Sequence, residues 1–154
     1  MEVTKQEYVD AVVDRICQYM DREMAGILAP MWTYTWQRFW YNGGPRGRKT
    51  VDEMIKDHRY ALSSRLYVHS AATWLRIAFD TVLARGKEVI SLDEYSLFLK
   101  CFDVHPLSAK FAFHSLDTNH DNLLSKEEFI NGGRLFFTAS NSTVGDHFWG
   151  PMLA

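Results

Sequence analysis

The amino-acid sequence predicts an all-α protein of paired helix–loop–helix units, joined through short β-bridges between their loops. Three observations support this fold class. Residues 117–128 carry oxygen-bearing side chains at the spacing of a metal-binding loop. Apolar residues recur at helical intervals on both sides of that loop. The closing part of the same pattern occurs upstream, in residues 3–7, 42–53 and 83–94, so we expect three and a half units in two packed lobes.

Residues 117–128 match the EF-hand calcium loop. Ca²⁺ takes roughly six to eight oxygen ligands, and a short loop provides them by turning every second residue inward. We expect Glu128 to supply both carboxylate oxygens and Leu123 its backbone carbonyl. The predicted ligands are Asp117, Asn119, Asp121, Leu123, Ser125 and Glu128. The pattern therefore predicts one bound Ca²⁺ as cofactor.

The sixth residue of this loop departs from the usual pattern. Asn122 stands where glycine is common, because the sharp turn needs a positive φ angle. Asn is one of the few other residues that tolerate this conformation, so we expect binding weaker by about 1 kcal/mol but not lost. His120, at the fourth position, is expected to face the solvent.

The N-terminal segment, residues 1–24, resembles the second half of another hand. Val3 fits a closing strand and Glu7 the twelfth-position acid, while the first helix and the ligand half of this hand are absent. An amphipathic helix follows, with apolar residues at helical spacing: Tyr8, Val12, Val13, Ile16, Cys17 and Met20.

Residues 25–65 fit a degenerate second hand. Its loop, 42–53, ends on Glu53 but has Gly44 and Arg46 at the third and fifth positions. A cation then faces the metal position, so Coulomb repulsion makes calcium binding improbable. We expect this loop to pair with the half-hand at Val3.

Residues 70–102 fit a degenerate third hand. Its loop, 83–94, keeps Ser91 and Glu94 at the ninth and twelfth positions, but Lys87 occupies the fifth. Leu83 and Arg85 are at the first and third positions, so the ligand half is lost and the loop remains as scaffold. We expect Ile90 to bridge to Leu124 of the calcium-competent hand.

That fourth hand spans residues 107–139. Its loop is flanked by apolar helical runs, which we expect to face the core: Phe111, Phe113 and Leu116 before it, and Phe129, Ile130, Leu135, Phe136 and Phe137 after it.

Residues 140–154 form a C-terminal tail that contains Phe148-Trp149-Gly150-Pro151-Met152. Together with the loop at 117–128, this tail resembles the invertebrate sarcoplasmic calcium-binding proteins, which are related to calexcitin, the coelenterazine-binding proteins and the photoproteins. The resemblance is strongest over residues 74–154. It implies a single domain, 1–154, with the tail packed on the core, and a role as intracellular calcium buffer. With one competent loop, a calcium-stabilised or sensor protein is the alternative, and we favour a calcium-stabilised form that does not open.

Composition limits the other function classes. The formal net charge of −2 gives no reason to expect nucleic acid as a partner. No apolar run is long enough to span a membrane, and the N-terminus lacks a signal-peptide core. Cys17 and Cys101 match no metal or redox spacing, so we expect free thiols in a cytoplasmic monomer.

Two further patterns leave alternatives open. Trp32, Trp36, Phe39 and Trp40 recur at helical spacing, which favours core packing. They also allow a cavity for a small hydrophobic ligand, as in the coelenterazine-binding relatives. Residues 43–50 partly resemble a phosphate-binding loop, and juvenile hormone diol kinase resembles this family. The motif lacks its second glycine and a preceding βαβ strand. No catalytic arrangement emerges from spacing, so we expect no enzyme.

Overall fold

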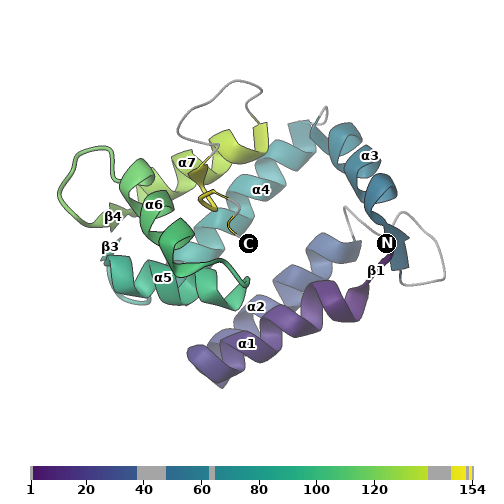
Figure 1. Ribbon diagram of the computed structural model, residues 1–154, viewed down its shortest axis with the longest axis horizontal. Helices are drawn as coiled ribbons and strands as arrows, with labels where there is room; N and C mark the ends of the chain where they lie inside the picture. The colour runs from purple at the N-terminus through teal and green to yellow at the C-terminus, as the bar shows by residue number, and fades with distance from the viewer. Residues whose placement is uncertain (1, 38–47, 63–64, 139–146, 152, 154) are drawn as a thin grey trace. The chain divides into compact units, whose positions relative to one another are not determined.

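The computed structural model describes residues 2–37, 48–62, 65–138, 147–151 and 153 (Figure 1). The chain divides into two compact units, Met1–Tyr67 and Val68–Ala154. Helices dominate both, and short two-stranded bridges are the β-structure in the described residues. The predicted all-α class is therefore confirmed. The single domain 1–154 stays a prediction.

The described part of the first unit contains a strand pair and the helices α1, α2 and α3. Its described elements are β1 (Glu2–Thr4), the π-helical turn η1 (Gln6–Asp10), α1 (Ala11–Tyr19), α2 (Arg22–Thr35), β2 (Arg48–Thr50) and α3 (Val51–Leu62). β1 pairs with β2 in antiparallel fashion, with Val3 opposite Lys49. The half-hand at Val3 thus pairs with the loop at 42–53, as predicted.

The core of this unit lies between the N-terminal helices, where α1 and α2 run side by side (Figure 1). Val12 and Ile16 are buried, as predicted, and Val9 joins them. The prediction for Cys17 was wrong, because its side chain is exposed. Successive helical residues lie about 100° apart, so Cys17, which follows Ile16, points away from the buried face that contains Val12 and Ile16.

The second unit contains the other helices and the second strand pair. Its elements are α4 (Arg65–Ile77), which crosses the unit boundary, the π-helical turn η3 (Ala78–Leu83), β3 (Val89–Ile90), α5 (Leu92–Cys101), α6 (Pro106–Leu116), β4 (Leu124–Ser125) and α7 (Lys126–Thr138). β3 and β4 are antiparallel, with Ile90 opposite Leu124. The predicted bridge is confirmed.

Aromatic and branched side chains from every helix of this unit fill its core. Fully buried members include Leu75, Phe79, Ile90, Tyr95, Phe98, Leu99, Phe113, Leu116, Leu124, Phe129 and Phe148. Two predicted core residues are exposed instead, Phe111 at 48% and Phe136 at 39%. The buried face of α6 passes through Ala109, Ala112 and Phe113, which leaves Phe111 to contact His147 at 4.8 Å between ring centroids.

The described part of the tail packs against this core. Phe148 is fully buried, and its backbone oxygen accepts a hydrogen bond from the Tyr95 hydroxyl at 2.7 Å. Ser108 Oγ donates to the Pro151 oxygen at 2.6 Å. The tail thereby contacts both α5 and α6.

Candidate metal centre

The loop 117–128 connects α6 to β4 and α7. Asp117 follows the last residue of α6, and its N–H donates to the Phe113 oxygen at 2.9 Å. Asp117 is 2% exposed, which is unusual for a carboxylate. The helix end therefore fixes the first predicted ligand at the buried edge of the loop.

Side-chain oxygens of the first, third and fifth residues wind this loop. Asp117 Oδ1 and Asn119 Oδ1 both accept from the Asp121 N–H, at 3.2 and 3.0 Å. Asp117 Oδ2 accepts from the Asn122 N–H at 3.0 Å, and Asp121 Oδ1 from the Leu123 N–H at 2.8 Å. Bonds from Asp and Asn side chains to N–H groups a few residues on are typical of tight turns. They bring the side-chain oxygens of Asp117 and Asn119 together at the Asp121 N–H.

Two residues of the loop have left-handed backbone conformations. Asn122 has a φ angle of 62°, which confirms the positive φ expected from its position. His120 has a φ angle of 60° and is exposed, as predicted. The loop therefore makes its sharp turn without glycine.

Glu128 ties the two ends of the loop together. Its Oε2 accepts from Ser125 N and Oγ at 3.0 and 2.7 Å, and its Oε1 accepts from Thr118 N and Oγ1, both at 2.9 Å. Burial raises the pKa of Glu128, but the hydrogen bonds from Ser125 and Thr118 outweigh it, so the net pKa is lowered. The carboxylate is thus kept ionised.

The donor types in this loop suit a hard cation. Carboxylate, amide, hydroxyl and backbone oxygens are all present within twelve residues, and no soft ligand is needed. Across the described residues, three or more His, Cys, Asp or Glu side chains do not gather as a metal-binding group. The six-oxygen ligand set therefore stays a prediction.

The same hydrogen-bonded motif closes the three loops and the N-terminal half-hand. In each, a Ser or Thr side chain accepts from the backbone N–H of a glutamate three residues later, whose carboxylate bonds back to the Ser or Thr. The pairs are Thr4 with Glu7, Thr50 with Glu53, Ser91 with Glu94, and Ser125 with Glu128. This is the capping box of a helix start. Each glutamate is the one that the sequence placed at the twelfth position of its loop.

Basic side chains in the degenerate loops have acidic partners. In loop 83–94, Lys87 Nζ donates to Glu94 Oε1 at 2.5 Å. In the first unit, Lys49 pairs with Asp57, and Arg48 pairs with Glu2 at 3.4 Å. The sequence predicted cations in these loops but did not identify their partners, because sequence spacing alone does not show cross-loop contacts.

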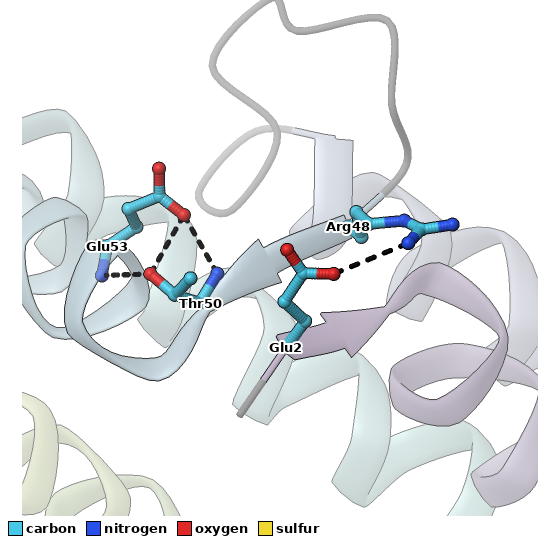
Figure 2. Close-up of a pocket in the computed structure, with 4 residues that line it drawn as sticks. All are labelled: Glu2, Arg48, Thr50 and Glu53. Atoms are coloured by element: carbon cyan, nitrogen blue, oxygen red, sulfur yellow. Dashed lines mark hydrogen bonds and ion pairs between the residues drawn. The ribbon is translucent and has the colours of Figure 1, made fainter.

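A polar cavity of about 360 Å³ lies beside the first strand pair, and sequence reasoning missed it (Figure 2). Glu2, Arg48, Thr50 and Glu53 line it. Figure 2 shows Glu53 bonded to Thr50, and Glu2 paired with Arg48. The Thr50 N–H is the main cause that holds the pKa of Glu53 below its ordinary value. These charges therefore already have partners within the protein.

The aromatic cluster of the first unit is packed where the structure describes it. Trp36 is 2% exposed, and Trp32 stacks on Tyr8 with ring centroids 5.4 Å apart. Trp32 Nε1 also donates to the backbone oxygen of Tyr8 at 2.8 Å. Phe39 and Trp40 lie outside the described residues, as do residues 43–47 of the phosphate-loop pattern.

Comparison with known proteins supports the fold. No protein-family model and no curated protein sequence matches the chain. Several solved structures resemble it, and three of them illustrate the likeness. A coelenterazine-binding protein from Renilla muelleri, in its calcium-loaded apo form, has a TM-score of 0.71 at 20% identity, and the match covers 98% of this chain and 86% of that chain.

The other two structures give similar matches. Okadaic acid binding protein 2.1 has a TM-score of 0.78 at 15% identity, covering 99% of this chain and 86% of that chain. A light-sensitive photoprotein has a TM-score of 0.65 at 17% identity, covering 92% of this chain and 75% of that chain. At these identities the likeness concerns the fold alone, and that fold is all-α.

Among the helices of the described residues, none is long and apolar enough to span a membrane.

Proposed function

We propose that the chain binds one Ca²⁺ through loop 117–128. The proposed ligands are the six named from the sequence: Asp117, Asn119, Asp121, Leu123, Ser125 and Glu128. When bound, the ion supplies a divalent charge that draws these oxygens together. One of the similar structures is described as calcium-loaded, which supports the choice of ion.

The observation that carries this proposal is the hydrogen bonding at Asp121. Its N–H is shared by one oxygen from Asp117 and one from Asn119. The first and third side chains of the loop are therefore oriented by the backbone of the fifth. Such preorganisation lowers the conformational cost of binding. In the partner loop 83–94 these three positions hold Leu83, Arg85 and Lys87, whose side chains carry no oxygen.

We further propose that the bound ion stabilises the second unit rather than opening a groove. A calcium sensor exposes an apolar groove between its helices on binding. Here Phe148 of the tail is fully buried and its ring lies 5.3 Å from that of Phe129, which directly follows Glu128. The protein's own tail thus occupies the space beside the calcium hand. A cytoplasmic monomer remains our prediction.

Isothermal titration calorimetry of the full chain tests the calcium site. We expect one site in the wild-type protein and none in Glu128→Gln, because the substitution removes a carboxylate charge and one oxygen ligand. Glu53→Gln is the matched control, since Glu53 ends the degenerate loop 42–53 with the same capping box. This control should retain one site. Two or more sites in the wild type, or calcium binding by Glu128→Gln with unchanged affinity, would contradict the proposal.

A second candidate function is the carriage of a small hydrophobic ligand. Two of the similar structures are named for binding coelenterazine and okadaic acid, which supports this alternative. The described rings of Tyr8, Trp32 and Trp36 pack on one another, which favours a filled core. Titration with either compound, followed by tryptophan fluorescence, tests the idea. Saturable quenching at one equivalent would support a carrier, and a linear response would exclude both ligands.

A further inference from the structure

Loop 83–94 lacks the acids of a calcium site but keeps part of its conformation. Its fourth residue, Gly86, has a φ angle of 73°, and the fourth residue of loop 117–128, His120, has a φ angle of 60°. Its ninth and twelfth residues, Ser91 and Glu94, form a capping box. The two loops of the second unit therefore share the turn at their start and the cap at their end.

The fifth residue distinguishes the two loops. It is Asp121 in loop 117–128 and Lys87 in loop 83–94. Ser91 N and Oγ hold Glu94 Oε2, at 2.8 and 3.1 Å, which leaves Oε1 to accept from Lys87 Nζ at 2.5 Å. Both oxygens of this twelfth-position carboxylate thus have partners. One of those partners is a cation from the position that faces the metal in a calcium loop.

The strand bridge connects this ion pair to the calcium loop. Val89 lies opposite Ser125, a proposed ligand, and Ile90 lies opposite Leu124. Ile90 and Leu124 are both fully buried, so the bridge is anchored in the core. A change in the closure of loop 83–94 would therefore reach the ninth position of loop 117–128 through backbone hydrogen bonds.

We propose that Lys87 is a built-in cation that takes the place of Ca²⁺ in loop 83–94 and thereby positions loop 117–128 for its single ion. This inference rests on the proposed calcium site. Because the ammonium is covalently attached, loop 83–94 stays closed at every calcium concentration. Loop 117–128 then pairs with β3 in the same conformation whether or not calcium is bound. Calcium binding therefore follows a single-site curve without cooperativity.

The expected change in calcium affinity is small because the ion pair between Lys87 and Glu94 is partly exposed to solvent. The side chains of Lys87 and Glu94 are 59% and 35% exposed, so water and salt screen their attraction. We therefore expect Lys87→Met to weaken calcium binding by about two- to fivefold. The sign is informative, because removing a positive charge without any positioning effect would strengthen Ca²⁺ binding.

Calorimetry on four full-length proteins tests the inference: wild type, Lys87→Met, Lys87→Arg and Lys110→Met. Lys110 is an exposed residue of α6, so its substitution removes the same charge from another place. We expect weaker calcium binding only in Lys87→Met, which should keep one site. Lys87→Arg keeps the positive charge, so its calcium affinity should match that of the wild type. An affinity that is unchanged or raised in Lys87→Met would overturn the inference while leaving the calcium site intact.

A measurement without calcium separates this inference from the proposed function. In EGTA, the side-chain carboxyl of Glu94 is followed by NMR as pH is lowered. We expect its pKa to rise in Lys87→Met, because the first cause that holds it down is the hydrogen bond from Lys87. An unchanged titration would show that the pair does not form and would overturn the inference. A wild-type chain that binds no calcium would instead overturn the proposed site together with the positioning role.

Discussion

The Tyr95 hydroxyl donates a hydrogen bond to the backbone oxygen of Phe148, at 2.7 Å and 53 residues further along the chain. Tyr95 directly follows Glu94, just as Phe129 directly follows Glu128. The Phe129 ring lies 5.3 Å from that of Phe148 and 6.4 Å from that of Tyr95. Both loops of the second unit therefore contact the same tail residue through the aromatic residue that follows their last acid.

We predict that Tyr95→Phe destabilises the protein by about 1 to 3 kcal/mol, because it removes a buried hydrogen bond. Burial raises the pKa of Tyr95, so the phenol remains a neutral donor across the physiological range. Urea denaturation measures the loss. Tyr34→Phe is the control, since Tyr34 is 53% exposed. Equal stability of the two variants would show that the hydrogen bond contributes nothing.

Gly133→Ala is predicted to destabilise the protein by about 1 to 3 kcal/mol through overpacking. A Cβ at this position of α7 would lie 2.5 Å from Leu75 Cδ2 and 3.0 Å from Phe148 Cε2, and both side chains are fully buried. Thermal and urea denaturation both report the change. Glycine at position 133 therefore leaves the space that Leu75 of α4 and Phe148 of the tail occupy in the core.

Gly26→Ala is the matched control for that substitution. Gly26 lies within α2 and is exposed, and a Cβ added there would meet no heavy atom within 4 Å. Alanine there should stabilise the protein by about 0.5 to 1 kcal/mol, because it reduces the freedom of the unfolded chain. Destabilisation by Gly26→Ala, or none by Gly133→Ala, would contradict this account of the two glycines.

The stability contribution of Glu94 should depend on pH. The hydrogen bond from Lys87, followed by that from the Ser91 N–H, lowers its pKa from the ordinary 4.5. A lowered folded pKa gives a contribution that is fully present above 4.5 and is lost as pH falls through the folded value. In EGTA, the difference in unfolding free energy between wild type and Glu94→Gln should therefore be constant near neutral pH and shrink in acid. A difference that persists at pH values where Glu94 is fully protonated would refute this linkage.

Local features of this molecule were predictable from sequence because they depend on residues close together in the chain. The positive φ angle at Asn122 follows from loop spacing and from the conformations open to asparagine. The bridge between Ile90 and Leu124 follows from placing both at the eighth position of their loops. The fold class follows from repeating one local pattern.

Long-range contacts were not predictable in the same way. Periodicity shows which residues share a helix face, but it does not show what that face meets. Nothing in the sequence near Ser108 indicates a hydrogen bond to Pro151, which is 43 residues away. Periodicity likewise did not show that Phe111 and Phe136 are exposed while Phe148 from the tail is buried. In the candidate site, sequence placed Lys87 in its loop, whereas only the structure shows that it binds Glu94.

Asn122→Ala should lower the free energy of unfolding by about 1 kcal/mol in saturating calcium, because alanine is strained at a φ angle of 62°. Asn122→Gly removes that strain but loosens the unfolded chain, so it should remain within about 0.5 kcal/mol of wild type. Urea denaturation of both variants and the wild type ranks their free energies of unfolding. The predicted ligands are unchanged in both variants. If Asn122→Ala were as stable as wild type, the left-handed turn at the sixth position would not be required for the folded loop.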